Sequence, residues 1–272
     1  MSVGEKIEVT DKKIKVLTIS DHPLSPSGVG TQTGYVIKEL LKTGKFQFFS
    51  LGGAIQHQDY RPQRFEEYGD EWLWEIENEV RSLIPMVYYH VWDNFPYPTY
   101  NKIWYDSTDV VVTISKLTSN IVQTVAPEVE EHYLPHAIPT EIFKPSDKQK
   151  VKEFRKKQFG MDDDHFFIFW NNRNARRKQS GSLIFWYKEF LDKIRKKNKD
   201  AKATLVMHSD PRDPNGQDLY RIIEELNLSR TDILLSVDKL QPDDLSLLYS
   251  SADVTIGISD AEGFGLSTFE SM

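Results

Sequence analysis

Short apolar segments rich in β-branched residues alternate along this sequence with segments of helical periodicity. The strand-like segments cover residues 15–20, 87–91, 110–115, 166–170, 204–208, 233–237 and 254–258, and the helix-like segments cover 31–42, 116–125, 182–197, 218–226 and 242–250. Alternation of this kind predicts parallel strands whose sheets are covered by helices on both faces. Because it runs through both halves of the chain, we expect an α/β protein with two doubly wound, Rossmann-like domains.

Two of the expected helices have distinct faces. The apolar residues of 182–197 fall on one stripe, formed by Leu183, Trp186, Phe190, Leu191 and Ile194. Lysine and arginine residues lie opposite this stripe, which is therefore expected to face a sheet. The acidic stretch 66–79 is expected to form another helix, with its charged face in solvent.

A change in charge and a run of prolines divide the chain near residue 145. Residues 1–145 carry 13 Lys and Arg against 20 Asp and Glu, whereas residues 146–272 carry 21 of each. The change falls beside residues 134–145, which contain three prolines and which we interpret as an interdomain linker. We therefore predict an N-terminal domain at 1–145 and a C-terminal domain at 146–272.

The composition excludes several classes of protein. No apolar run approaches the roughly 18–20 residues that a membrane span needs, and the N-terminal segment lacks the apolar core of a secretory signal. The absence of cysteine rules out disulfides, thiolate catalysis and cysteine-bound zinc. A net charge of −7 argues against a nucleic-acid partner, since such proteins usually present a basic surface. We expect a cytoplasmic globular protein without a transmembrane segment.

Function is expected just after the strands, because open parallel sheets bind ligands at the carboxyl ends of their strands. After the first strand come Gly28 and Gly30, which would let a ligand approach the backbone closely at the start of a helix. Their pattern is one residue too long for the dinucleotide-binding fingerprint. Two interpretations stay open: an anion or sugar site, or a turn in which Ser27 or Thr31 caps the helix.

A cluster of four cations follows the strand at 166–170. It consists of Arg173, Arg176, Arg177 and Lys178. Placed between a strand end and a helix, these side chains would concentrate positive potential on a phosphate. The alternatives are a solvated loop or a nucleic-acid patch, and the position at a strand end favours phosphate.

Two carboxylates follow the last strand, at 254–258. Glu262 precedes two glycines, and Glu270 comes eight residues later. If a helix begins near Ser267, Glu262 lies in the loop before it and Glu270 lies in its first turn. Glu262 would then point into the ligand-binding crevice, and the two carboxylates would reach different parts of one ligand. The alternative for Glu270 is a helix capping box with Ser267.

Several of these segments resemble those of a known protein family. Residues 260–272 are similar to the Glu-x7-Glu signature of family 4 glycosyltransferases, which are retaining enzymes of the GT-B fold. Arg173 and Lys178, five residues apart, resemble the Arg and Lys pair of that family. The linker resembles its crossing segment, with His136 and Ala137 where Asn-Gly is usual. The Gly28 and Gly30 segment also fits, and the resemblance runs in order through most of residues 14–272.

The resemblance implies roles for these residues. Arg173 and Lys178 would hold the diphosphate of a nucleoside-diphosphate sugar donor, Glu262 would grip its sugar, and Glu270 would bind the ribose. Further contacts to the donor would come from the backbone N–H groups of Gly263, Phe264, Gly265 and Leu266. The implied activity is that of a retaining hexosyltransferase-type glycosyltransferase, without a metal or another cofactor. The acidic run 162–164 is accordingly interpreted as a turn rather than a metal site.

One histidine and an aromatic run are the candidates for the acceptor side. His90, at the end of the strand at 87–91, resembles the histidine that the family places near the acceptor, and the alternative is a packed structural histidine. The aromatic run at 88–105 could stack on a sugar or fill a core. The acceptor is expected to be a carbohydrate, a lipid or a protein.

The sequence departs from the family pattern at its end. It stops at Met272, inside the helix expected to carry Glu270, and its second half shows only four strand-like segments. An incomplete second domain would leave a sheet edge uncovered, which a homo-oligomer or a partner chain could cover. The alternative to an enzyme is therefore a non-catalytic sugar-nucleotide-binding module that needs a partner chain.

Overall fold

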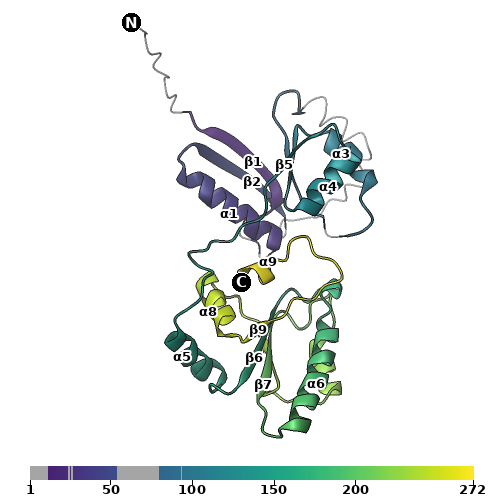
Figure 1. The fold of residues 1–272 in the computed structure, drawn as a ribbon. Coiled ribbons are helices and arrows are strands. Elements are labelled where there is room, and N and C mark those ends of the chain that lie inside the picture. Colours follow the sequence, from purple (N-terminus) through teal and green to yellow (C-terminus); the bar gives the residue numbers. More distant parts are fainter. Residues whose placement is uncertain (1–11, 24, 26, 54–79, 93) are drawn as a thin grey trace. The chain divides into compact units, whose positions relative to one another are not determined.

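The computed structural model describes residues 12–23, 25, 27–53, 80–92 and 94–272 (Figure 1). The chain divides into two compact units between residues 72 and 73. The expected helix at 66–79 lies outside the described residues. Within the described part of the chain, no helix is both long enough and apolar enough to cross a bilayer.

The first unit contains two parallel strands and the helix between them in sequence. β1 (Ile14–Asp21) pairs with β2 (Phe46–Gly53) along all eight residues of each strand. α1 (Gly28–Lys42) begins three residues before the expected helix, because the hydroxyl of Ser27 caps it by accepting a bond of 2.9 Å from the N–H of Gly30.

The second unit contains a three-stranded and a four-stranded parallel sheet. The three-stranded sheet has the order β3-β4-β5. Its elements are β3 (Val87–His90), η3 (Thr99–Asn101), α3 (Lys102–Asp106), β4 (Val110–Thr113), α4 (Lys116–Val125) and β5 (Glu130–Tyr133). Val111 of β4 packs with Ile121 and Val122 of α4 in one buried cluster.

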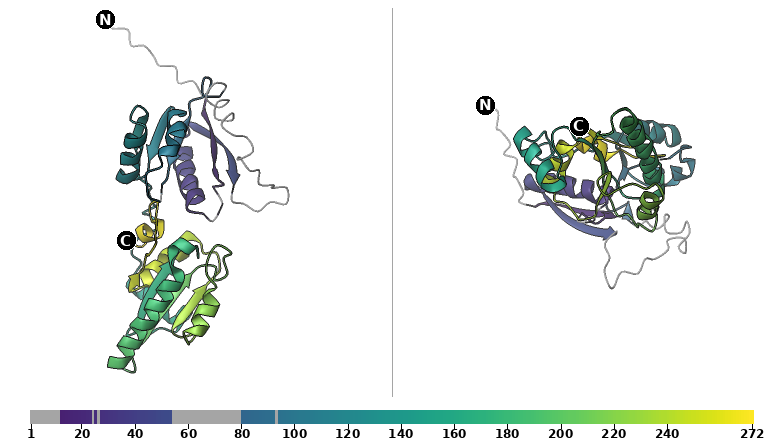
Figure 2. Two further views of the ribbon diagram at one scale, coloured as in Figure 1. Left: turned by 90° about the vertical axis from the view of Figure 1, so that its right-hand side faces the viewer. Right: turned by 90° about the horizontal axis from the view of Figure 1, so that it is seen from below.

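The four-stranded sheet has the order β8-β7-β6-β9, so its central strands are β7 and β6. In chain order its elements are α5 (Lys148–Phe159), β6 (Phe166–Asn171), η4 (Arg176–Lys178), α6 (Ser180–Lys197), β7 (Ala203–His208), α7 (Leu219–Glu225), β8 (Ile233–Ser236), α8 (Pro242–Ser251), β9 (Val254–Thr255) and α9 (Leu266–Glu270). Helices α5 and α6 lie on opposite faces of this sheet (Figures 1 and 2).

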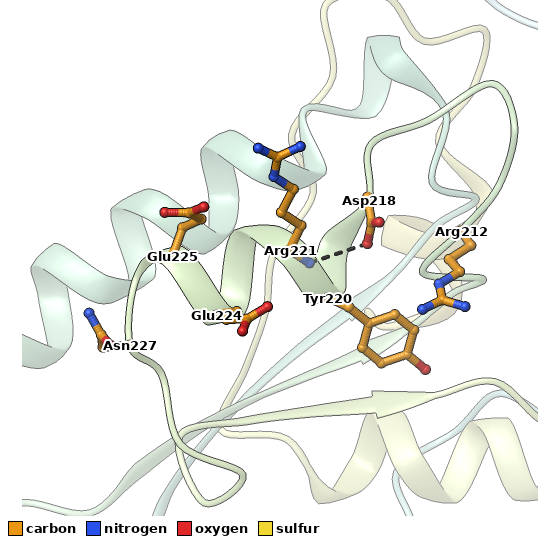
Figure 3. A pocket seen from close by; sticks show the side chains of 7 residues that line it. All are labelled: Arg212, Asp218, Tyr220, Arg221, Glu224, Glu225 and Asn227. Carbon is orange, nitrogen blue, oxygen red and sulfur yellow. Dashed lines mark hydrogen bonds between the residues drawn. The ribbon is translucent and has the colours of Figure 1, made fainter.

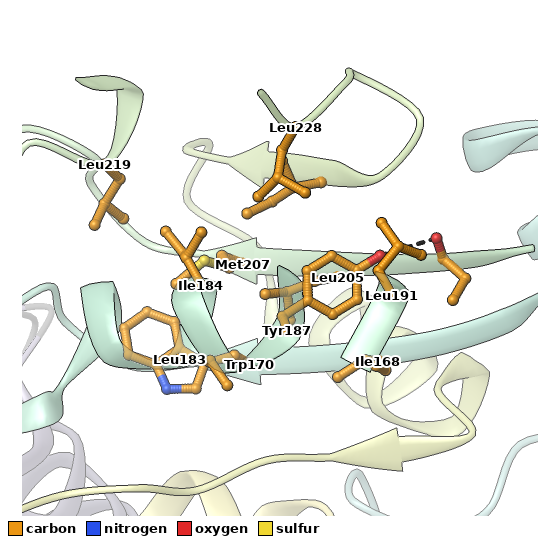
Figure 4. Close-up of a cluster of buried hydrophobic side chains, with 12 residues drawn as sticks. Ile168, Trp170, Leu183, Ile184, Tyr187, Leu191, Leu205, Met207, Leu219 and Leu228 are labelled. Carbon is orange, nitrogen blue, oxygen red and sulfur yellow. Dashed lines mark hydrogen bonds between the residues drawn. The ribbon is translucent and has the colours of Figure 1, made fainter. Parts of the chain in front are cut away.

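Alternate residues of β6 serve two separate cores. Ile168 and Trp170 pack in the cluster that contains the buried face of α6 (Figure 4). Phe167 and Phe169 pack in a second cluster, with Phe143 and residues of α8. Every residue from Phe167 to Trp170 is buried, as expected for a strand of a parallel sheet that is covered on both faces.

The structure confirms the expected alternation and the parallel sheets, and it adds elements that we did not expect. These are β2, β5, α3 and α5. One expectation about α6 is wrong: Trp186 is 53% exposed. The buried face of the helix follows Leu183, Tyr187 and Leu191, spaced by four residues, and Trp186 lies at the margin of that face.

The expected linker does not stand apart from the second unit. Phe143 is buried in the second core of the four-stranded sheet, and the hydroxyl of Ser246 in α8 donates to the carbonyl of Ile142 at 2.7 Å. The predicted domain boundary near residue 145 therefore falls inside the second unit, and it stays a prediction.

Candidate functional site

Three loops meet beyond the carboxyl ends of β6, β7 and β9, at the edge where parallel sheets bind ligands. They cover residues 172–179, 209–218 and 256–265. The first and third loops are joined by the backbone of Arg177, whose carbonyl accepts from the N–H of Asp260 at 2.8 Å. The guanidinium of Arg177 also donates to the carbonyl of Ala261 at 2.6 Å.

Lys178 and Glu262 are in direct contact between these two loops. The ammonium of Lys178 donates to a carboxylate oxygen of Glu262. The short 3₁₀ turn η4 carries Lys178 inward, so its side chain is only 10% exposed, whereas that of Glu262 is 36% exposed. Arg177 lies 3.8 Å from the same carboxylate. The structure thus brings together two of the residues singled out from the sequence, and their contact leaves Glu262 partly open to solvent.

Arg173 is held by a residue that the sequence did not single out. Its Nε donates to Asp213 at 2.6 Å and its Nη2 at 3.2 Å, so the guanidinium and the carboxylate form a two-point pair. This pairing lowers the pKa of Asp213. Asp213 belongs to the loop that follows β7, and no local pattern in the sequence connects it with Arg173.

A buried amide network ties the loops after β6 and β7 together. The side chain of Asn174, which is fully buried, donates to the carbonyl of Gln217 at 2.7 Å and accepts from the hydroxyl of Ser180 at 2.6 Å. Gln217 in turn accepts from the N–H of Gly181, at the start of α6, at 2.8 Å. Gly216 lies so close that a Cβ atom there would sit 1.8 Å from the carbonyl oxygen of Asn174. These contacts fix the backbone that follows Arg173.

Glu270 lies on α9 beside Tyr249 of α8. The hydroxyl of Tyr249 donates to Glu270 at 3.1 Å and accepts from the side chain of Asn171 at 2.7 Å. Burial raises the pKa of Glu270 to about 7. The proposed capping box is not formed, because α9 begins at Leu266 after Gly265 and has no side-chain cap.

The segment from Gly263 to Leu266 turns the chain into α9. Gly265 adopts a φ of 82°, a left-handed conformation that favours glycine. The ring of Phe264 packs edge-on against His136 of the expected linker, with ring centres 5.0 Å apart. His136 also lies 2.8 Å from the hydroxyl of Tyr89, and burial lowers its pKa to about 4. Phe264 thereby anchors the segment that follows Glu262.

His90 has the contacts of a packed histidine. Its side chain is fully buried at the end of β3, with Nε2 at 3.1 Å from the hydroxyl of Tyr105 and Nδ1 at 3.4 Å from that of Tyr88. Burial lowers the pKa of His90 to about 4, so the ring is neutral at pH 7. Of the two interpretations left open by the sequence, these contacts favour the structural one, because neither ring nitrogen is left for an acceptor.

Gly28 and Gly30 occupy the first turn of α1, in the first unit. Gly30 packs closely under the preceding segment: a Cβ atom there would sit 2.2 Å from the hydroxyl oxygen of Ser25 and 2.6 Å from the carbonyl of His22. The interpretation in which Ser27 caps the helix is correct. The proposed contact of these glycines with the donor stays a prediction.

The acidic run 162–164 is paired with lysines. Asp163 lies 2.5 Å from the ammonium of Lys152, and Asp162 and Asp164 lie 3.7 and 3.3 Å from that of Lys202. Among the residues that the structure describes, no cluster of three or more His, Asp or Glu side chains is arranged to hold a metal ion. The expected independence from metals stays a prediction.

An open pocket of about 580 Å³ lies beside α7 and the segment before it (Figure 3). Its lining is mainly charged and consists of Arg212, Asp218, Tyr220, Arg221, Glu224, Glu225 and Asn227. None of the residues singled out from the sequence lines it, and its opposite charges select no ligand class.

Comparison with known structures identifies the fold. The chain is similar to Anabaena HepE, solved in complex with UDP-glucose, with a TM-score of 0.63 and 13% identity over 94% of this chain and 77% of that one. It is also similar to WaaG, a glycosyltransferase involved in lipopolysaccharide biosynthesis, with a TM-score of 0.61 and 12% identity over 94% and 78% of the two chains.

A third similar structure is alpha,alpha-trehalose 6-phosphate synthase from Burkholderia multivorans, with a TM-score of 0.64 and 11% identity over 94% of this chain and 80% of that one. The chain has the fold of these proteins. The GT-B type of α/β fold expected from the resemblance is thereby confirmed. No protein-family model and no curated protein matches the sequence.

Proposed function

We propose that this protein is a glycosyltransferase that moves a sugar from a nucleoside-diphosphate sugar to an acceptor hydroxyl with retention of configuration. One observation carries the proposal: the buried Lys178 contacts Glu262 where two loops meet at the carboxyl edge of the sheet. That edge belongs to a fold shared with a glycosyltransferase and with a protein that binds UDP-glucose.

The chemistry of the leaving group explains the cations. Breaking the bond between the sugar and the diphosphate leaves negative charge on the diphosphate, and charges fixed in advance stabilise the transition state more than the ground state. Lys178 and Arg173 would supply that charge, assisted by the N–H groups from Gly263 to Leu266. Glu262 would exchange its contact with Lys178 for the sugar hydroxyls, and Glu270 would accept hydrogen bonds from the ribose.

Retention requires the acceptor to attack from the face that the leaving group vacates. In the proposed step the acceptor oxygen bonds to the anomeric carbon as the bond to the phosphate oxygen breaks. The acceptor proton passes to an oxygen of the departing diphosphate, so no protein base and no metal is needed.

The acceptor in this proposal is a hydroxyl group of a carbohydrate, a lipid or a protein. We also propose that the protein is located in the cytoplasm.

A thermal-shift experiment tests donor binding. A ligand that binds the folded state at about 100 times its Kd stabilises that state by roughly 2.7 kcal/mol. We expect a rise in Tm with one of UDP, GDP and ADP, no rise with NAD, and loss of the rise in Lys178→Ala. Lys193→Ala is the matched control, because Lys193 is exposed on α6 and should leave the shift unchanged.

Turnover of the donor sugar tests catalysis separately. With the nucleotide chosen by the thermal shift, its glucose conjugate is incubated with the protein and release of nucleotide is measured. We expect slow hydrolysis, abolished in Glu262→Gln. Nucleotide binding without any sugar release would favour the non-catalytic binding module over the enzyme.

A further inference from the structure

Asp213 and Arg173 form a pair with unequal exposure. The side chain of Asp213 is 9% exposed, whereas that of Arg173 is 64% exposed. An exposed arginine ordinarily samples many rotamers, and ordering such a side chain on binding costs conformational entropy. Here the two-point contact with the enclosed carboxylate orders the guanidinium before any ligand arrives.

Asp213 is itself held on a fixed frame. Its carboxylate accepts from the N–H of Asn215 at 2.9 Å, and the carbonyl of Asn215 accepts from the N–H of Arg176 at 3.0 Å. The loop of Asp213 is thus bonded to the loop of Arg173 close to the ion pair. The buried network of Asn174 and Gln217 ties the two loops at a second point.

The geometry of the guanidinium leaves one edge for a ligand. Arg173 uses its Nε and one hydrogen of Nη2 for Asp213, and the contacts of the described residues assign no partner to Nη1. A guanidinium carries five N–H donors in a planar fork that matches the oxygens of a phosphate. Nη1 and the second hydrogen of Nη2 together form such a fork.

We propose that Asp213 is a positioning residue for the diphosphate site, which holds Arg173 by one edge so that the other edge can bind the anion. The inference rests on the proposed function and adds a residue to it from the loop after β7. Asp213 does not touch the donor; it acts through Arg173. The competing possibility is that the Asp213 charge keeps Arg173 away from the anion, and it predicts the opposite sign in the experiment below.

A double-mutant cycle on pyrophosphate binding tests the proposal. Affinities of inorganic pyrophosphate are measured by calorimetry for the unaltered protein, Asp213→Ala, Arg173→Ala and the double variant. We expect each single variant to weaken binding about tenfold, and the double variant to bind no more weakly than Arg173→Ala, because residues that act through one another are not additive. A merely structural role of Asp213 would weaken binding further in the double variant.

Asp210→Ala is the matched control. Asp210 lies in the same loop and is exposed, and among the described contacts its carboxylate accepts only from the N–H of Arg212, at 2.9 Å. We expect it to leave pyrophosphate affinity unchanged. Equal weakening by Asp210→Ala and Asp213→Ala would overturn the inference, as would tighter binding in Asp213→Ala.

A second readout needs no ligand. Pairing with Asp213 should slow the exchange of the Nε proton of Arg173, which is observable by 15N NMR. Asp213→Asn keeps an acceptor oxygen but loses the charge, and we expect it to exchange faster than the unaltered protein and more slowly than Asp213→Ala. Identical exchange in all three proteins would overturn the inference.

The two proposals fail in different ways. If the unaltered protein binds neither pyrophosphate nor any nucleoside diphosphate, the proposed function is wrong and the inference fails with it. If the unaltered protein binds pyrophosphate and Asp213→Ala binds it equally well, the inference alone is wrong and the proposed function stands.

Discussion

Burial of Glu270 against Tyr249 gives this carboxyl a pKa of about 7, compared with an ordinary value of 4.5. The folded state therefore binds the proton more tightly than the unfolded state does. The contribution of Glu270 to the free energy of unfolding should be highest below pH 4.5, fall as the pH rises toward 7, and level off above it. Each unit of pKa difference corresponds to about 1.4 kcal/mol.

The first prediction concerns Glu270→Gln, which keeps the shape of the side chain but cannot ionise. We expect the variant to lose the decrease in unfolding free energy between pH 5 and 8 that Glu270 causes in the unaltered protein. Urea unfolding at four pH values in this range measures the difference. Glu225→Gln, on the exposed face of α7, is the control and should follow the unaltered protein. Parallel curves for all three proteins would contradict the assigned burial of Glu270.

The second prediction concerns the hydrogen bond between the hydroxyl of Tyr105 and His90. Tyr105→Phe leaves Nε2 of the fully buried His90 without its partner. Such a loss should lower the unfolding free energy by about 1–3 kcal/mol. Tyr100→Phe removes a hydroxyl from a side chain that is 69% exposed and should change little. Equal stability of both variants would show that the His90 contact is not formed in solution.

At the scale of the element, the sequence predicted β6, which is buried on both faces, and missed β5, which is polar. Residues 166–170 form a continuous apolar run, and β6 is observed at Phe166–Asn171. β5 has the sequence Glu-Glu-His-Tyr, which shows no apolar alternation. Its position in the sheet is determined instead by pairing with β4. Such a strand depends on contacts distant in sequence, which local pattern does not contain.

Helix α5 was missed for a different reason, because the sequence does contain residues that mark the two ends of this helix. Nine of its residues between Lys148 and Phe159 are charged or amide side chains, which hid the apolar face. Its ends are nevertheless marked: Asp147 caps the N-terminus with bonds to two backbone N–H groups, and Gly160 ends the helix in a left-handed conformation with φ of 65°. Capping residues thirteen positions apart would have identified this helix.

The third prediction concerns the packing of the loop after β6 against the loop after β7. A methyl group in Gly216→Ala would collide with the backbone carbonyl of Asn174, so the loops after β6 and β7 must move apart. We expect a loss of about 1–3 kcal/mol in unfolding free energy and weaker pyrophosphate binding, measured by urea unfolding and calorimetry. Arg212→Ala, an exposed change in the same loop, should alter neither. An unaffected Gly216→Ala variant would mean that the loops are not packed as described.

At the scale of the whole molecule, the candidate site shows where sequence reasoning stops. Arg173, Lys178, Glu262 and Glu270 could be singled out, because each follows a recognisable strand. Asp213, the partner of Arg173, could not be singled out, since the pair joins residues 40 positions apart in two loops. The site is assembled by the order of the strands, which places the loops after β6, β7 and β9 together.

The fourth prediction concerns where the molecule responds to a nucleotide. Hydrogen exchange should slow at residues 171–181, 209–217 and 259–270 when the nucleoside diphosphate selected by thermal shift is added, because ligand binding suppresses local opening. The same data report on Gly28 and Gly30 in the first unit, whose protection would support their predicted role. Protection confined to the pocket beside α7 would instead point to a different binding site.

The two-sided burial of β6 has a consequence for how this chain can diverge. Phe167 and Phe169 face one core, and Ile168 and Trp170 face the other. Inserting or deleting a single residue in the strand would exchange the two sets, moving aromatic rings into a space shaped for the opposite neighbours. The loops that follow the strand do not alternate between two cores, so a change in their length moves no buried side chain to the wrong face. Over evolutionary time, we therefore expect length changes to accumulate in the loops that could set substrate choice, while the length of β6 is preserved.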